Sequence, residues 1–121
     1  MTKTDLIAAI KKKRSFLCVG LDTDIRRIPE KFLAFEDPIL AFNKTIIEIT
    51  APYAVAYKPN TAFYENTGSK GWKTLEDTFA AMPDDVLKIA DAKRGDIGNT
   101  SNQYAEAGFS ILGADAITVA P

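Results

Sequence analysis

Four short runs of β-forming residues recur along the chain at a nearly constant spacing, which limits the possible folds more than any other feature. The runs begin at residues 16, 54, 86 and 116, so consecutive starts lie 38, 32 and 30 residues apart. A strand, a crossover helix and the return to a parallel strand require about 30 residues or more. We therefore expect four consecutive parallel strands, over residues 16–21, 54–57, 86–90 and 116–120.

Two amphipathic segments of the same register lie between the first three runs and predict the crossover helices. Asp37 supplies an N-cap before Pro38 at the first helical position, and Ser69 introduces a second helix that ends before Pro83. In each segment apolar residues recur at helical intervals along one face. These expected core positions are Ile39, Phe42, Ile46 and Ile49 in the first helix, and Trp72, Leu75, Phe79 and Met82 in the second.

Two further helices are predicted from the residues at their ends. The basic run at 11–14 is typical of the last turn of a short N-terminal helix, where cations complement the helix dipole. Thr100 followed by Gln103 has the form of a capping box, which favours a helix that begins near Asn99 and ends near Gly108.

The composition excludes several classes of function. The 121 residues carry 15 Lys and Arg against 16 Asp and Glu, a net charge of -1 that offers no electrostatic footprint for nucleic acid or an anionic membrane. Histidine is absent, which excludes His-dependent nucleophiles and His-ligated zinc. Neither a signal peptide nor an apolar stretch of membrane-spanning length is present. The single cysteine, Cys18, lies in an apolar run, so we expect it to be buried, in a protein of the reducing cytoplasm.

The loops after the strands distinguish an open α/β sheet from part of a barrel. The first strand runs into Gly20-Leu-Asp22 without the G-x-G-x-x-G turn of a dinucleotide-binding sheet. Polar residues instead gather at the carboxyl ends of successive strands, as in a barrel active site. They are Asp22, Asp24, Lys58, Asn60, Asp91, Lys93 and Asp96. Because a complete barrel runs to about 250 residues, we expect residues 1–121 to be the N-terminal half of a single (β/α)8 TIM barrel domain.

The stretch from Asp91 to Thr100 reads DAKRGDIGNT and carries the most chemical information. Residues 91 and 93 are two apart, so a continuing strand would place a carboxylate beside an ammonium on one face. Asp96 follows beyond Gly95, whose backbone freedom would let the loop turn toward a neighbouring site. An ion pair followed by a turn at the end of a strand is the structural alternative for these residues.

Three motifs at equivalent positions of successive repeats carry a resemblance to a known family. They are GLD at 20–22, KPN at 58–60 followed by AFYE at 62–65, and DAKRGDIGNTS at 91–101. Together they resemble the orotidine 5'-phosphate decarboxylase family, and most closely its bacterial branch, over essentially all of the chain. The resemblance implies a homodimeric enzyme of pyrimidine biosynthesis that converts orotidine 5'-phosphate to UMP and carbon dioxide with no cofactor and no metal ion.

Position by position, the resemblance implies roles for the polar residues of this chain. Lys93 matches the lysine that delivers a proton to C6 of the pyrimidine, and Asp91 matches the carboxylate placed against the substrate carboxylate. Lys58 matches the lysine that joins this charged network and contacts the ribose. Asp22 matches a residue that holds a ribose hydroxyl, and Asn60 matches a further polar group on the ribose side.

The resemblance also implies an active site shared between two subunits. Asp96 matches the aspartate that reaches into the partner's active site, and Thr100 is expected beside it. In the family, the arginine that grips the phosphate and the loop that closes over the pyrimidine follow later strands, and no arginine of this chain matches that motif. Since remote phosphate contacts supply binding energy for catalysis, we expect negligible activity from the isolated chain.

Two other functions stay open on the sequence alone. The sugar-phosphate branch of the same suprafamily, such as hexulose-phosphate synthase or ketogulonate-phosphate decarboxylase, shares D-x-K-x-x-D but uses magnesium. It carries a metal-binding glutamate on the second strand where this chain has Lys58, which favours the metal-free decarboxylase. The other alternative is a non-catalytic half-barrel that associates with itself through its open strand edges.

Overall fold

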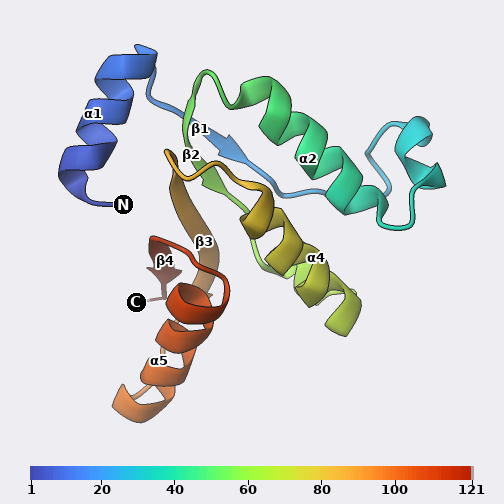
Figure 1. The fold of residues 1–121 in the computed structure, drawn as a ribbon. Coiled ribbons are helices and arrows are strands. Elements are labelled where there is room, and N and C mark those ends of the chain that lie inside the picture. The colour runs from blue at the N-terminus through green and yellow to red at the C-terminus, as the bar shows by residue number, and fades with distance from the viewer. Residues whose placement is uncertain (121) are drawn as a thin grey trace.

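The computed structural model describes residues 1–120 and contains a sheet of four parallel strands in the order β1-β2-β3-β4 (Figure 1). The strands are β1 (Leu17–Gly20), β2 (Ala54–Lys58), β3 (Leu87–Arg94) and β4 (Ala116–Val119). Each strand pairs with the next along the chain, as the spacing of the β-rich runs predicts. β3 continues four residues beyond its expected end at residue 90, which places the residues of the DAKR segment within the strand.

Helices connect the strands in regular alternation. They are α1 (Lys3–Lys13), the 3-10 turn η1 (Glu30–Ala34), α2 (Pro38–Thr50), α3 (Ala62–Glu65), α4 (Ser69–Ala81), α5 (Gly98–Ala105) and the π-helical segment η2 (Glu106–Ile111). The sequence predicts α1, α2, α4 and α5. It does not predict η1 and α3, because helices of about one turn are too short to show a hydrophobic period.

Local capping explains where the predicted helices begin and end. The Asp37 carboxylate accepts a hydrogen bond of 2.9 Å from the amide of Leu40, and Pro38 occupies the first turn, so the expected N-cap of α2 is confirmed. Three lysines lie in the last turn of α1, which ends at Arg14 in a left-handed conformation, as the basic run predicts. Gly68, with a φ of 67°, is the N-cap of α4, and Ser69 is its first helical residue.

The beginning of α5 differs from the expectation. Thr100 is not an N-cap: α5 begins at Gly98 after Ile97, and no side chain caps it. The helix also continues past Gly108, because η2 extends it to Ile111; Gly113, which follows the C-cap Leu112, has a φ of 68° that suits the end of a helix. Gly108 has a packing role instead, since a Cβ there would lie 2.0 Å from the side chain of Ile117 in β4.

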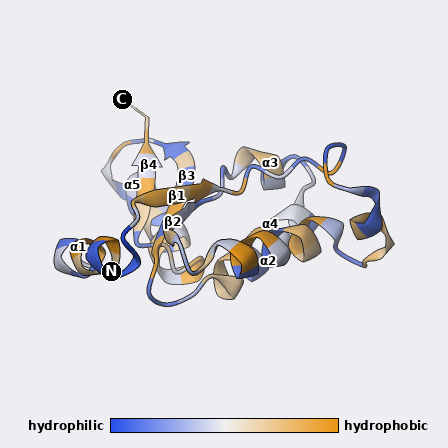
Figure 2. Ribbon diagram, turned by 90° about the horizontal axis from the view of Figure 1, so that it is seen from above, coloured by the Kyte–Doolittle hydropathy of each residue, from blue (hydrophilic) through white to orange (hydrophobic). Residues whose placement is uncertain are grey.

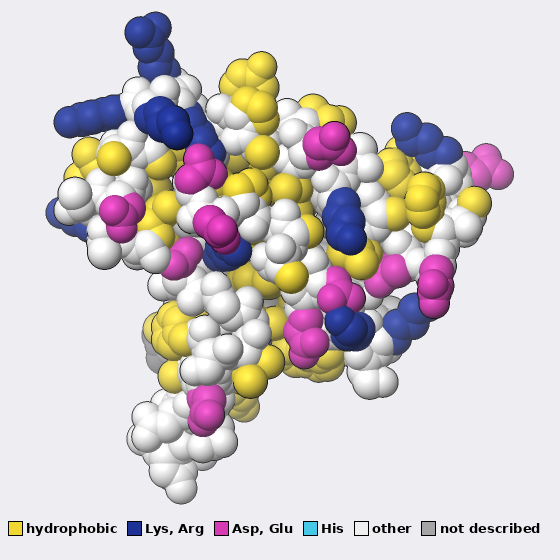
Figure 3. Space-filling view, in the orientation of Figure 1, with side chains coloured by type: hydrophobic (Ala, Val, Ile, Leu, Met, Phe, Trp, Pro, Cys, Tyr) yellow, Lys and Arg dark blue, Asp and Glu magenta, His cyan; other side chains and the backbone are white. Residues whose placement is uncertain are grey.

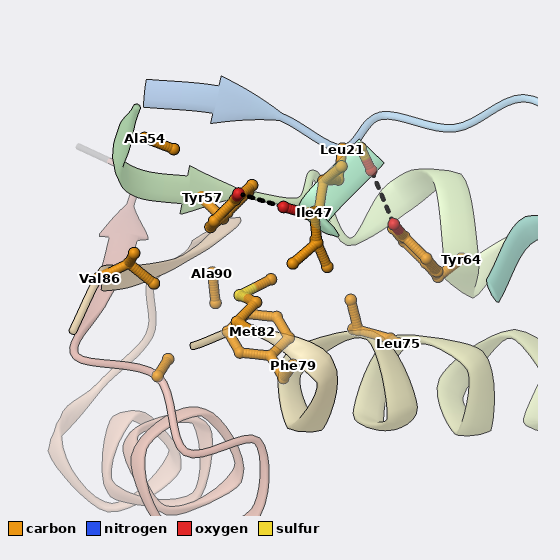
Figure 4. Close-up of a cluster of buried hydrophobic side chains, with 11 residues drawn as sticks. Leu21, Ile47, Ala54, Tyr57, Tyr64, Leu75, Phe79, Met82, Val86 and Ala90 are labelled. Carbon is orange, nitrogen blue, oxygen red and sulfur yellow. Dashed lines mark hydrogen bonds between the residues drawn. The ribbon is translucent and has the colours of Figure 1, made fainter. Parts of the chain in front are cut away.

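The hydrophobic core lies between the sheet and the helices α2 and α4 (Figure 4). Tyr57 on β2 is fully buried, and its hydroxyl donates to the carbonyl of Ile47 on α2. Leu75 and Phe79 approach from α4, as the sequence predicts for that helix. The other buried members of the cluster are Leu21, Ala54, Tyr64, Met82, Val86, Ala90 and Ala114.

The expected burial of two residues, Ile49 and Trp72, is wrong. α2 turns Asn43 and Ile47 most deeply into the core, and Ile49, about 200° further round the helix than Ile47, is 64% exposed. Trp72 is 39% exposed because it lies toward α5, where it lines a small surface cavity with Tyr104. The hydrophobic period is compatible with several adjacent stripes on a helix, and only packing against the sheet selects one of them.

Cys18 is exposed, which overturns its expected burial. It lies on β1, an edge strand that pairs only with β2 in the sheet of residues 1–120. Figure 2 shows β1 in the orange of hydrophobic residues, yet Leu17 is 42% exposed and the adjacent Phe16 is 87% exposed. An apolar run therefore indicates a strand here without indicating which elements cover it.

Charged side chains of both signs are interspersed over the face in Figure 3. Among the basic side chains at the end of α1, that of Lys13 is partly buried and pairs with Asp85. In the part of the chain that the structure describes, every helix is too short or too polar to cross a membrane.

A buried polar network holds the loop after β1 to three helices. Asn43 on α2 is fully buried and donates to the hydroxyls of Tyr64 on α3 and Thr78 on α4. Its carbonyl oxygen accepts a bond of 2.6 Å from Thr23, and the Tyr64 hydroxyl donates at 2.7 Å to the carbonyl of Leu21. Burial raises the pKa of Tyr64 to about 12, which keeps this donor protonated. The network fixes the residues on both sides of Asp22.

Replacing Tyr64 tests this network. Tyr64→Phe removes the hydroxyl that donates to the Leu21 carbonyl and accepts from the Asn43 amide, and both partners are left buried without it. We therefore expect a loss of about 1 to 3 kcal/mol in the free energy of unfolding. Equilibrium urea unfolding measures the change. Tyr53→Phe is the matched control, because Tyr53 is 62% exposed. Equal unfolding midpoints for the two variants would contradict the stabilising role of the network.

Candidate active site

A single carboxylate at the carboxyl end of the sheet joins two lysines from adjacent strands. Lys58, the last residue of β2, places its Nζ 2.9 Å from Oδ2 of Asp91 on β3. Lys93, also on β3, places its Nζ 2.6 Å from the other oxygen, Oδ1. The structure therefore brings together three of the residues that the sequence selects, with one ammonium on each carboxylate oxygen.

The two lysines stabilise the ionised form of this carboxylate. Hydrogen bonds hold the pKa of Asp91 well below its usual range, against the opposing effect of burial. The bond from Lys93 contributes most, the bond from Lys58 comes next, and the bond from the Thr118 hydroxyl contributes less. The bond to Asp91 raises the pKa of Lys58. The Asp91 side chain is only 10% exposed, whereas that of Lys93 is 63% exposed. The Lys93 ammonium is thus accessible to solvent, while the carboxylate that holds it is mostly buried.

The backbone reaches this arrangement by a different route from the one that the sequence suggests. A regular strand through residues 91–93 would put both side chains on one face, but Lys93 has a φ of 48°, in the left-handed region. Such a conformation costs about 1 to 2 kcal/mol for a residue other than glycine. The expected pairing of carboxylate and ammonium is present, and an irregularity of β3 produces it instead of a continuing pleat.

Thr118 on β4 completes the cluster, and the sequence alone does not identify it. Its hydroxyl donates to Asp91 Oδ1 at 2.8 Å and accepts from the amide of Lys93 at 3.0 Å. The available signal was its place in the fourth β-rich run beside the polar end of the third. A lone threonine in a strand is common, so that signal becomes specific only when the register of the strands is known.

Asp22 and Asn60 lie next to the cluster and are connected to it through the backbone. The amide of Asn60 donates to Asp22 Oδ1 at 3.0 Å, and Asn60 forms a parallel bridge with Asp91. The amide of Asp91 in turn donates to the carbonyl of Pro59 at 3.0 Å. These bonds hold the loop after β1, the loop after β2 and the carboxylate of β3 at one level of the sheet.

Three other candidates from the sequence lie outside this cluster. Asp24 pairs with Arg26, which keeps the pKa of Asp24 at about 2. Asp96 is exposed on the loop after β3, where its carboxylate accepts from the amide of Ile97 at 2.7 Å. Thr100 is partly buried in the first turns of α5. None of these three contacts Asp91 or the lysines through a hydrogen bond within residues 1–120.

The acidic residues do not form a metal site in the described part of the chain. Residues 1–120 contain no group of three or more Asp, Glu, His or Cys side chains placed to hold an ion. At the cluster itself both oxygens of Asp91 are already engaged by ammonium groups. The arrangement can bind an anionic ligand beside Lys93 and can donate a proton from its exposed Nζ.

Comparison with known proteins identifies the family. Residues 15–121 match the model of the Orotidine 5'-phosphate decarboxylase / HUMPS family. The chain is 59% identical over its whole length to the orotidine 5'-phosphate decarboxylase of Phocaeicola vulgatus, of which it covers 46%. It is also 59% identical to that of Parabacteroides distasonis, of which it covers 44%.

Solved structures agree with the sequence matches. A putative orotidine-monophosphate decarboxylase from Toxoplasma gondii superposes with a TM-score of 0.88 at 42% identity, over 96% of this chain and 40% of that one. The OMP decarboxylase of Leishmania donovani gives a TM-score of 0.80 at 40% identity, over 96% of this chain and 42% of that one. The chain thus spans about half the length of the relatives it matches. Its four alternating strands and helices are those of a partial TIM barrel, and the chain belongs to the Orotidine 5'-phosphate decarboxylase / HUMPS family.

Proposed function

We propose that residues 1–121 are the N-terminal half of a single barrel domain that converts orotidine 5'-phosphate to UMP and carbon dioxide. The observation that carries the proposal is the cluster of Lys58, Asp91 and Lys93 at the carboxyl end of the sheet. Barrel enzymes build their active sites at this end. The likeness of the whole chain to decarboxylases supports the assignment of substrate.

In the proposed reaction Lys93 is the acid. Loss of carbon dioxide from C6 of the pyrimidine leaves an electron pair on carbon, and no adjacent electron sink takes it up. A cation must therefore lie close to the developing charge and then deliver a proton to C6. Lys93 suits both tasks because its Nζ is fixed on Asp91 at 2.6 Å while the side chain remains 63% exposed to an incoming ligand.

Asp91 has a double role in this proposal. It fixes both lysines, and it would face the carboxylate of the substrate. Two like charges about 4 Å apart repel by about 4 kcal/mol at an effective dielectric constant of 20. Enzymes commonly lower activation barriers by about 8 to 23 kcal/mol, so this repulsion accounts for a minor part of the lowering. The larger part is electrostatic stabilisation of the transition state, with binding energy drawn from the remote phosphate.

Lys58 favours the metal-free reaction over the magnesium-dependent chemistry of the sugar-phosphate branch. Its ammonium lies 2.9 Å from Asp91 Oδ2, on the strand where that branch is expected to carry a glutamate ligand. A cation on this carboxylate oxygen opposes the binding of a second cation there. The lone thiol of Cys18, which is exposed, fits a reducing compartment, and we place the enzyme in the cytoplasm.

We propose further that the active protein is a homodimer in which Asp96 and Thr100 serve the partner's active site. Asp96 is exposed and lies on the loop between β3 and α5, without a hydrogen bond to the Lys58–Asp91–Lys93 cluster of its own chain in the structure of residues 1–120. Isologous dimers give each subunit the same reciprocal contribution. Asp22 and Asn60 would contact the ribose, since both lie beside Asp91.

A comparison of the activity of the isolated chain with that of the full-length protein distinguishes the proposed function from its alternatives. By full-length protein we mean residues 1–121 followed by a C-terminal half of the length found in the relatives. We expect it to convert orotidine 5'-phosphate to UMP, and we expect no measurable conversion by the isolated chain, because the remote phosphate contacts are missing. Chromatographic detection of UMP and the mass in solution are the measurements. A full-length protein that associates with itself but does not form UMP would overturn the proposed function, and measurable conversion by the isolated chain would contradict the expected need for the remote phosphate contacts.

Replacing Lys93 tests the assignment of the acid. Lys93→Ala in the full-length protein should lower kcat by about 10³-fold or more, in the range that general acids contribute. UMP should still bind, because the phosphate and ribose contacts remain. Steady-state kinetics and calorimetric titration with UMP give the two quantities. Lys12→Ala, on the exposed side of α1, is the control for loss of a positive charge. Turnover near the wild-type rate in Lys93→Ala would exclude Lys93 as the acid.

Mixed dimers test whether Asp96 acts across the interface. A dimer of one Lys93→Ala chain and one Asp96→Ala chain has one intact site if Asp96 serves the partner, and none if it serves its own chain. Co-expression of the two inactive variants should therefore restore about a quarter of wild-type activity for random pairing. The specific activity of the purified mixture measures this. Activity no higher than that of the single variants would show that Asp96 acts in its own subunit or not at all.

A further inference from the structure

The pairing of β3 with β4 contains an irregularity centred on the cluster. Ala90 pairs with Ile117 and Arg94 pairs with Val119, so three residues of β3 lie opposite one residue of β4. The three are residues 91–93, and the single residue opposite them is Thr118. Bulges of this kind redirect side chains and interrupt the ladder of backbone hydrogen bonds. The interruption here falls on the two residues that carry the proposed chemistry.

Where the backbone hydrogen bonds between β3 and β4 are interrupted, the side chain of Thr118 supplies hydrogen bonds to β3. The Thr118 hydroxyl oxygen accepts from the amide of Lys93, 3.0 Å away, at the residue whose φ is 48°. The same hydroxyl donates to Asp91 Oδ1, 2.8 Å away. Because the amide can only donate and the carboxylate can only accept, the direction of both bonds is determined. One hydroxyl therefore fixes the strained backbone of Lys93 and the orientation of the carboxylate that holds its Nζ.

We propose that Thr118 is a positioning residue for the acid, which sets the Lys93 ammonium and the Asp91 carboxylate in the geometry used for proton delivery. This inference rests on the proposed function. With Lys58 on Oδ2 and both Lys93 and Thr118 on Oδ1, the carboxylate is held from β2, β3 and β4. Removal of the hydroxyl takes away one of the three bonds that orient the Asp91 carboxylate and leaves the Lys93 amide without its acceptor.

The test uses three variants of the full-length protein. Thr118→Val keeps the shape of the side chain and removes the hydroxyl, whereas Thr118→Ser keeps the hydroxyl and removes a methyl group. Thr45→Val is the matched control, because in the structure of residues 1–120 the Thr45 hydroxyl bonds only to the carbonyl of Ala41 within α2. Circular dichroism and thermal melting establish that each variant is folded before the other measurements are made.

Kinetics and carboxyl titration give independent readouts. We expect Thr118→Val to lower kcat by about tenfold, as loss of a hydrogen bond to a charged group implies, with KM nearly unchanged. Thr118→Ser should recover most of the rate. In Thr118→Val the pKa of Asp91, followed by carbon NMR of labelled aspartate, should rise toward its ordinary value, because a hydrogen bond to the ionised form is lost. Thr45→Val should change neither quantity.

The two readouts distinguish failure of this inference from failure of the proposed function. If the wild-type protein shows no decarboxylation, the proposed function fails, and the titration of Asp91 still decides whether Thr118 acts on that carboxylate. If the wild type is active and Thr118→Val keeps both its kcat and the pKa of Asp91, the positioning role is wrong. Equal losses in Thr118→Val and Thr118→Ser would also overturn it, since they would assign the effect to the methyl group.

Discussion

The register between parallel strands is the constraint on which the proposed site depends. Gly20 pairs with Lys58, and Asn60 bridges to Asp91, so the residues that follow β1 and β2 reach the level of Asp91 on β3. A slip of one residue in any pair would turn the side chains to the opposite face. The ion pair of Lys58 with Asp91 therefore follows from the pairing of β2 with β3, whereas the ion pair of Lys93 with Asp91 follows from the irregularity within β3.

The helices act on the site through the register that they stabilise. α2 and α4 bury Ile47, Leu75 and Phe79 against the sheet, and the bonds of the buried Asn43 extend from α2 to the loop that carries Asp22. Most of the core thus lies on the helix side of the sheet, while the charged cluster lies at the strand ends. This division is typical of barrels, in which stability and chemistry use different parts of each strand.

The sequence predicts the order of the strands, the main helices and the three charged members of the cluster, because spacing, caps and motifs are local signals. It does not predict what depends on packing between elements. Ile49 and Cys18 are apolar yet exposed, since the sheet and helices of residues 1–120 leave those positions uncovered. Thr100 resembles a cap, but α5 begins two residues earlier. Thr118 becomes a site residue only through the three-to-one pairing of β3 with β4, which no single strand reveals.

In the proposed function, the carboxylate of Asp91 holds Lys93 where it can protonate C6 of the pyrimidine. A crystal structure of the full-length protein with bound UMP tests this most directly. We expect Nζ of Lys93 to remain paired with Asp91 and to lie about 3 to 3.5 Å from C6, the separation of reacting atoms in a productive complex. A pyrimidine ring bound elsewhere, or a C6 atom that faces a different acid while Lys93 points away, would contradict it.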